Sequence, residues 1–253
     1  MRNPVNPDES GRIVLPLPPA PAVALDDPLA IAGYGAQLLA LVEQQAAAGS
    51  DDRAAARLVA EMDNIHQAMR AHDVGAIRRS VGLLGRLLGR DVEMQEQAER
   101  LAGQLDVCLV RADGIVAELQ KALPVRLRQA ALVTEAVNAI DAWADAGERL
   151  LQGAATQADA GSTLAVAALQ RRLHHLRGVA RLRALEASQL QLLHAQGVEL
   201  LERYQRIRDV LLPLWRQQML ASKAVDTSLR LAMAADAQAR ILVEVEAMQA
   251  RLH

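Results

Sequence analysis

Phenylalanine is absent from this chain of 253 residues, which contains only two tryptophans and two tyrosines. β-Sheets depend on aromatic and β-branched side chains for much of their packing, so a sheet core is not expected. The sequence is instead rich in alanine, leucine, arginine and glutamine, which are good helix formers. The composition therefore predicts an all-α fold, in a chain long enough to bury a sizeable core.

Cysteine occurs once, at Cys108, which excludes an internal disulfide and is typical of a reducing compartment. The formal net charge is −2, so the chain as a whole has no positive field for nucleic acid or an anionic membrane. An apolar run of about 18 residues, the length that spans a bilayer, is also missing. Lysine occurs only at 121 and 223, an arginine bias expected of GC-rich, bacterial coding. These features predict a soluble, cytoplasmic protein with no nucleic-acid partner.

The first 28 residues lack the uninterrupted apolar stretch of a secretory signal, because prolines recur throughout them. Proline-rich segments stay extended and do not pack a core at low cost. Residues 1–28 are therefore predicted to be a disordered tail, with a short docking motif as the alternative. Residues 29–253 are predicted to form one helical bundle domain.

Three short helices are predicted at the start of this domain. The first covers 29–48, with a later start at Gly33 and Gly35 as the alternative. It ends at the turn Gly49-Ser50-Asp51, where Ser50 or Asp51 can cap the second helix. The apolar stripe of the second helix is Ala54, Leu58, Met62, Ile65 and Met69. The third is capped by Asp73 and carries Val74, Ile77, Val81, Leu84 and Leu88.

Heptad-like stripes dominate the rest of the chain, which favours long paired helices. The first long stripe is Met94, Ala98, Leu101, Leu105, Cys108, Ala112, Ile115, Leu119 and Ala122. Pro124 is expected to end or kink this helix, and a partner helix follows, with Ala130, Val133, Val137, Ile140, Ala144, Gly147 and Leu151 facing inward.

A break at 154–162 precedes a very long helix over about 163–210. Its heptad stripe continues past Pro213, where a kink and not a stop is expected, and a last helix follows. The stripe of the long helix is Leu190, Leu193, Gly197, Leu200, Tyr204, Ile207, Leu211 and Leu214. That of the last helix is Leu220, Ala224, Thr227, Leu231, Ala234, Gln238, Ile241, Val245, Met248 and Leu252. Since a helix rises about 1.5 Å per residue, the sequence predicts an elongated antiparallel bundle with coiled-coil character.

The segment from Leu169 to Arg183 is the most basic part of the chain and contains no acid. Its charged residues are Arg171, Arg172, His174, His175, Arg177, Arg181 and Arg183. On a helix they spread over more than half of the circumference, beside a buried stripe of Leu169, Leu173, Leu176 and Ala180. The first interpretation is a solvated face whose arginine stems cover apolar surface. The alternative is a site for an anion or an acidic partner.

Catalytic and metal-binding patterns are not found. His174 and His175 are neighbours, about 100° apart on a helix, whereas two histidines that share a metal ion are usually spaced i, i+4. Cys108 lies on a buried stripe with no histidine nearby in the sequence to activate it. Phosphate-binding loops, nucleophile elbows and dinucleotide fingerprints are missing as well. The sequence therefore predicts a protein that is not an enzyme and has no metal site and no cofactor.

Trp215 stands at a joint between helices, in the stretch VLLPLWRQQML. A proline kink at Pro213 frees backbone carbonyls, and the indole N–H of Trp215 or the amides of Gln217 and Gln218 could satisfy them. Two interpretations follow: a structural plug at a hinge, which is the favoured one, or a binding surface that includes Trp215 and Gln218.

Six stretches, taken in order, resemble motifs of the toxic-anion (tellurite) resistance family, the TelA-like proteins. They are Tyr34-Gly35 with Gln37, His72-Asp73-Val74-Gly75 through Leu83-Leu84, Ala142 to Leu150, Arg172 to Leu176, Ser188 to His194, and Pro213 to Gln218. Three positions depart from the family pattern: His175, Ser188 and Gln191 stand where the family has Asp, Pro and Arg. The family's Thr-Asn motif near the C-terminus is not found, and the chain is short for the family.

The resemblance implies an all-helical cytoplasmic protein tied to oxyanion stress, without an established catalytic residue. Three hypotheses follow. The first is a non-enzymatic scaffold that contacts other stress-resistance proteins, and also forms homo-oligomers through its long helices. The second is a direct binder of oxyanions or phosphate ligands through Arg171, Arg172, Arg177 and Arg181 with His174 or His175. The third, a basic helix on anionic lipid or nucleic acid, is disfavoured by the overall acidity.

Overall fold

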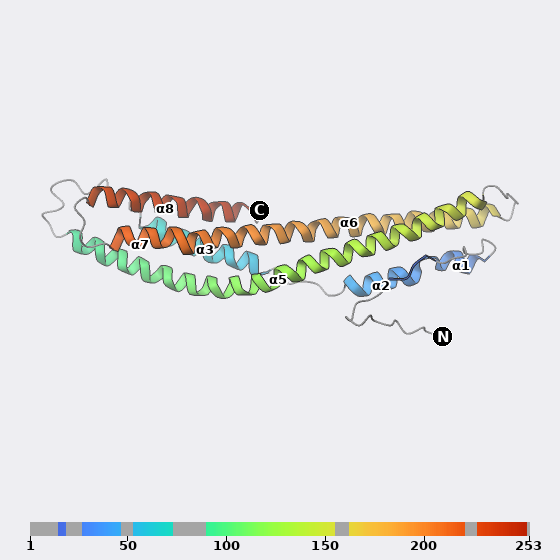
Figure 1. Cartoon of the computed structure of the whole chain (residues 1–253), viewed down its shortest axis with the longest axis horizontal. Helices are drawn as coiled ribbons and strands as arrows, with labels where there is room; N and C mark the ends of the chain where they lie inside the picture. Colours follow the sequence, from blue (N-terminus) through green and yellow to red (C-terminus); the bar gives the residue numbers. More distant parts are fainter. Residues whose placement is uncertain are drawn as a thin grey trace. The chain divides into compact units, whose positions relative to one another are not determined.

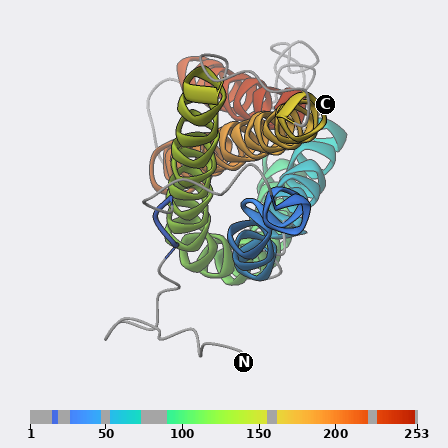
Figure 2. The same ribbon diagram turned by 90° about the vertical axis from the view of Figure 1, so that its right-hand side faces the viewer.

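The computed structural model of the chain describes residues 15–18, 27–46, 53–72, 90–154, 162–220 and 227–251. Within these ranges every regular element is a helix and no strand occurs (Figure 1 and Figure 2). The predicted all-α helical bundle is therefore confirmed. The predicted turn at Gly49-Ser50-Asp51 and the third helix, begun by Asp73, lie outside the described residues.

The helices follow the sequence in the order shown in Figure 1. They are α1 (Pro28–Gly33), α2 (Ala36–Ala46), α3 (Arg53–Ala71), α5 (Arg90–Ala154), α6 (Ser162–Arg206), the π-helix η2 (Ile207–Leu211), α7 (Leu212–Leu220) and α8 (Thr227–Ala250). Their contacts divide the chain into two compact units, where the sequence predicted one domain. Unit 1 comprises residues 1–50 and 125–193, and unit 2 comprises 51–124 and 194–253.

Unit 1 packs α1 and α2 against the second part of α5 and the first part of α6. Its core consists of Ile31, Tyr34, Leu38, Val42, Ala136, Ile140, Ala144, Leu169, Leu173, Leu176 and Ala180. Arg177 of α6 pairs with Asp141 of α5, whereas Leu173, a turn earlier, lies beside Gly147, a later residue of α5. These contacts place the two segments antiparallel.

The prediction of one continuous helix over 29–48 is wrong, because the structure has two helices, α1 and α2, in this range. The break falls at Tyr34 and Gly35, where Gly35 has a φ of 70°, a left-handed conformation that favours glycine. Asp27 caps α1 by accepting a 2.9 Å hydrogen bond from the Leu29 amide, and Pro28 opens the helix.

Residues 15–18 belong to the predicted disordered tail, yet the structure describes them as a segment of unit 1 without regular secondary structure. The side chain of Leu15 packs against the core of this unit, and the Trp143 indole donates a 2.8 Å hydrogen bond to the Pro16 carbonyl. Proline has no backbone N–H, so the backbone of Pro16 can only accept a hydrogen bond, as it does from Trp143.

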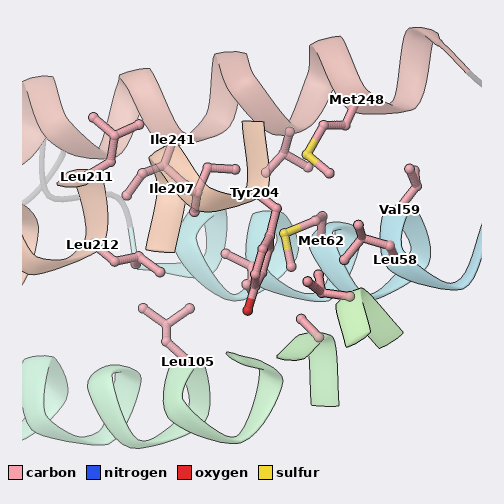
Figure 3. Close-up of a cluster of buried hydrophobic side chains, with 14 of the residues drawn as sticks. Leu58, Val59, Met62, Leu105, Tyr204, Ile207, Leu211, Leu212, Ile241 and Met248 are labelled. Carbon is pink, nitrogen blue, oxygen red and sulfur yellow. The ribbon is translucent and has the colours of Figure 1, made fainter. Parts of the chain in front are cut away.

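Unit 2 packs α3, the first part of α5, the end of α6, η2, α7 and α8 around a larger core (Figure 3). The predicted stripe of α3 is buried in full, and most of the predicted stripes of α5, of the long helix that comprises α6 and η2, and of α8 are buried with it. The buried members include Leu58, Met62, Ile65, Met69, Leu101, Leu105, Ala112, Leu119, Leu200, Tyr204, Ile207, Ile241, Val245 and Met248. The prediction of which faces turn inward is therefore confirmed at these positions.

Pro124 does not end its helix, since α5 runs from Arg90 to Ala154 without interruption. The two helices predicted on either side of this proline are one element, and the predicted partner helix after it is wrong. A proline inside a helix leaves the carbonyl four residues earlier without its donor. That residue is Gln120, and both it and Pro124 are exposed, so water can satisfy the freed group.

Pro213 is also tolerated, as predicted, but through a change in the hydrogen-bond register. The residues before it form η2, in which the Leu212 amide donates to the Ile207 carbonyl five residues earlier. A single π-turn of this kind accommodates an irregularity within an otherwise α-helical segment. The helix therefore continues through α7 to Leu220.

Candidate functional site

Residues from three of the stretches quoted above meet in unit 1, and we call them the motif cluster: Tyr34, Gly35, Trp143, Gly147, Arg172, Leu173 and Leu176. The Tyr34 hydroxyl donates a 2.7 Å hydrogen bond to the Trp143 carbonyl. The two rings meet edge to face, with centroids 5.2 Å apart. Burial raises the pKa of Tyr34. The phenol is therefore a structural hydrogen-bond donor.

The two glycines of the motif cluster stand where helices approach closely. A Cβ at Gly147 would overlap Leu173 Cδ2 and would lie 3.2 Å from Tyr34 Cε1. A Cβ at Gly35 would lie 3.2 Å from Leu176 Cδ2. Both glycines are therefore explained by packing against α6.

Arg172, predicted as an anion ligand, is used inside unit 1. Its Nε donates a 2.7 Å hydrogen bond to the carbonyl of Tyr34. Tyr34 is the C-cap of α1, and the last carbonyls of a helix have no donor within the helix. Arg172 therefore stabilises the break between α1 and α2.

Arg177 faces three carboxylates of α5. Its guanidinium binds Asp141 at 2.7 Å, Glu148 at 3.1 Å and also Asp145. The hydrogen bonds that Arg177 donates to Asp141 and Asp145 raise its pKa far above the usual range. These acids compensate the charge that the isolated α6 segment leaves unbalanced, so the local basicity is lower than the sequence indicated.

The remaining charged residues of the segment separate into paired and exposed groups. Arg183 binds Glu186 at 2.6 Å on its own helix. Arg171, His174, His175 and Arg181 are exposed, and none of them has a hydrogen-bond or ion-pair partner among the described residues. The predicted site is thus not brought together as one pocket: Arg172 and Arg177 are used internally, and the other four residues face solvent.

Arg172→Gln is expected to lower the free energy of unfolding of unit 1 by about 1–2 kcal/mol, because a charge-assisted hydrogen bond to a helix-terminal carbonyl is lost. Chemical denaturation followed by Trp143 fluorescence, in a Trp215→Phe background, measures the change. Arg171→Gln is the matched control, since the exposed Arg171 contacts no described partner and its replacement should change stability by less than about 0.5 kcal/mol. Equal effects of the two substitutions would contradict the capping role.

Trp215, the other predicted aromatic site, is fully buried in unit 2. Its indole N–H has no acceptor among the described residues, so the prediction that it satisfies a carbonyl freed at Pro213 is wrong. Gln218 is half-buried on the same helix. A fully buried indole cannot form part of an exposed binding surface, which leaves the structural plug as the supported interpretation.

Two charged networks in unit 2 were not found from the sequence. Arg203 joins Glu199, at 2.8 Å, to Glu244, at 2.6 Å, and Arg206 also binds Glu244. Only the i, i+4 pair of Glu199 and Arg203 has a sequence signal, because Glu244 lies on α8.

The second network surrounds Tyr204, whose hydroxyl donates a 2.6 Å hydrogen bond to Asp113. Arg208 binds the same carboxylate at 2.9 Å. Burial, together with this hydrogen bond, raises the pKa of Tyr204 far above its usual range. The phenol therefore stays protonated and serves as a structural donor.

Unit 2 is expected to lose stability as the pH falls below about 4.5. Burial favours the neutral acid at Glu244, but its bonds to Arg206 and Arg203 outweigh burial and lower the pKa of this carboxyl. A carboxyl whose pKa is lowered by folding stabilises the folded state at pH values above its pKa in the unfolded chain. This contribution disappears as the pH falls and the carboxyl is protonated. The melting temperature of Glu244→Gln should accordingly be lower than wild type at pH 7 and change less between pH 5 and pH 3. Parallel curves for the two proteins would contradict this assignment.

Among the described residues, no three His, Cys, Asp or Glu side chains come together in a group that could hold a metal ion. None of the helices in the described ranges combines the length and hydropathy needed to span a bilayer.

Comparison with known proteins identifies no relative: no family model matches the sequence, and neither a curated protein nor a solved structure is similar to the chain.

Proposed function

We propose that this protein is a non-enzymatic helical scaffold of the bacterial cytoplasm that acts in resistance to tellurite or related oxyanions by contacting other stress-resistance proteins. The observation that carries the proposal is the use of Arg172 and Arg177 inside unit 1. Both belong to the set of residues that the sequence offers as anion ligands, yet Arg172 Nε is bound to the Tyr34 carbonyl and Arg177 is bound to three carboxylates of α5. The basic segment therefore offers an exposed surface for a partner protein and not a pocket of converging charges.

The distribution of the exposed arginines favours a scaffold over a direct oxyanion binder. Arg171 and Arg181 are ten positions apart on α6, which corresponds to about 15 Å along the helix axis. Preorganised oxyanion sites hold their donors around one small ion. At this separation the guanidinium groups of Arg171 and Arg181 do not surround one small ion.

The link to oxyanion stress comes from the resemblance to TelA-like proteins, and the motif cluster supports it. Tyr34, Trp143, Gly147 and Arg172 come from separate stretches of the sequence, yet they contact one another or shared neighbours in unit 1. A set of motifs that together define one packing arrangement is what a shared fold would require. The same contacts give these residues structural roles, in keeping with a family that offers no catalytic residue.

Deletion of the gene in its own host is expected to lower tolerance to tellurite, and expression of the wild-type protein should restore it. Calorimetry of the full chain with tellurite and with inorganic phosphate should show no saturable heat. Unchanged tolerance would contradict the role in oxyanion stress. A saturable heat that Arg171→Ala abolishes would replace the scaffold with a direct binder.

A further inference from the structure

Helix α6 carries a second apolar stripe in unit 1, on the face opposite to its buried one. Leu182, Leu185 and Leu192 are 69%, 62% and 58% exposed. Their spacings of three and seven residues place them on one side of the helix. The residues that enter the core, such as Leu176 and Ala180, point the other way.

The same face turns basic toward the start of the helix. Arg171, His174, His175 and Arg181 are exposed on or beside this line, all N-terminal to the leucines. Within residues 171–192 this face therefore has two consecutive zones along the helix axis, a basic one at 171–181 and an apolar one at 182–192, and the exposed Leu164 lies on the same side before them. We call residues 171–192 on this side of α6 the docking face.

We propose that the docking face binds an amphipathic helix of a partner protein, with acidic side chains opposite Arg171 and Arg181 and large aliphatic side chains opposite Leu182, Leu185 and Leu192. The proposal rests on the scaffold function and names the chemistry of its partner. An apolar helix face is a common recognition surface for a second helix, and complementary charge at one end sets the register.

Charge complementarity disfavours a second copy of the same face as the partner. Between residues 169 and 193 the only acid is Glu186. It is already bound to Arg183 at 2.6 Å. A second copy of the docking face would therefore offer no free acid to Arg171 and Arg181 of the first.

The order of the zones also favours a helix over a membrane surface. A helix that lies on anionic lipid carries basic residues on the polar side along its apolar stripe. Here the exposed basic residues precede the leucines along the axis, and the acids around Arg177 flank the basic end. Anionic lipid would meet those acids, whereas a narrow helix can dock beside them.

Fluorescence anisotropy with synthetic helical peptides and the full-length protein tests the proposal. The probe is a labelled peptide with glutamates in its first turns and leucines at i, i+3, i+7 and i+10 of its second half. Its two comparison peptides replace glutamate by lysine or scramble the order. We expect saturable binding of the acidic peptide, at least about tenfold tighter than either comparison peptide.

Variants of the docking face assign the two zones. Leu182→Ser with Leu185→Ser should weaken binding of the acidic peptide about tenfold or more, while Arg171→Glu with Arg181→Glu should reverse the preference toward the lysine peptide. The matched control is Leu127→Ser with Arg128→Glu on α5, which changes an exposed leucine and an exposed arginine of the same unit. This control should bind like wild type.

Several results would overturn the proposal. Equal affinity for the acidic and lysine peptides, or no effect of the leucine variants, would refute the helix site. Binding to phosphatidylserine vesicles that the leucine variants abolish would assign the face to lipid. A dimer in light scattering that the same variants dissociate would assign it to a second copy. None of them bears on tolerance to tellurite, so the proposed function can fail or survive independently.

Discussion

Trp215→Ala is expected to lower the free energy of unfolding of unit 2 by about 3–5 kcal/mol. The indole is fully buried in the core that α3, α5, η2, α7 and α8 share, and alanine would leave a cavity there. Loss of the buried area and incomplete relaxation around the cavity act in the same direction. Denaturation followed by circular dichroism measures the effect, and hydrogen exchange assigns it to α7 and α8.

Two further substitutions identify the cause of this loss. Trp215→Phe keeps most of the buried ring and removes an N–H that has no acceptor among the described residues, so it should cost less than about 2 kcal/mol. Leu229→Ala, at a position that is 58% exposed in the same unit, should change stability by less than about 0.5 kcal/mol. A cost of Trp215→Ala no larger than that of Leu229→Ala would exclude Trp215 as a core plug.

Gly147→Leu is expected to destabilise unit 1 by about 3 kcal/mol, because even a Cβ at this position overlaps Leu173 Cδ2. Leu173 is buried between α5 and α6, so it has little room to move away. The two tryptophans separate the units, since Trp143 lies in unit 1 and Trp215 in unit 2. Denaturation followed by Trp143 fluorescence in a Trp215→Phe background therefore reports on unit 1.

A glycine without close neighbours provides the control for Gly147. Gly178 lies within α6, and nothing would contact a Cβ placed there within 4 Å. Gly178→Ala should thus stabilise the helix by about 0.5–1 kcal/mol. Adding Leu173→Ala to Gly147→Leu should recover part of the loss, so that the double variant costs less than the sum of the two single changes. Strict additivity would show that the overlap with Leu173 is not the cause.

The helical class and the inward faces of the helices could be predicted from the sequence, because both depend on local periodicity. Leu101, Leu105 and Leu119 recur at heptad spacing, and all three are buried. The sequence indicates that Pro124 ends or kinks its helix, but local periodicity cannot decide between the two. The local rule says that proline interrupts or kinks a helix, and the structure shows α5 continuing through it at an exposed position, where water can satisfy the carbonyl of Gln120.

The candidate site required the tertiary structure for a similar reason. The sequence shows a basic segment, but Asp141 lies 36 positions from Arg177, and Tyr34 lies 138 positions from Arg172. No periodicity connects residues so far apart. Their pairing depends on how α5 and α6 align with each other and on where the chain breaks between α1 and α2.

The sequence by itself determined that this protein is built from helices, which of their faces are apolar, and where arginine is concentrated. Only the tertiary structure decided which arginines are neutralised by acids within the protein and which, like Arg171 and Arg181, remain exposed beside solvent-exposed leucines. Helix formation and burial follow from the spacing of neighbouring residues along one chain segment. Charge compensation follows from the register between segments, which packing sets across long separations in sequence.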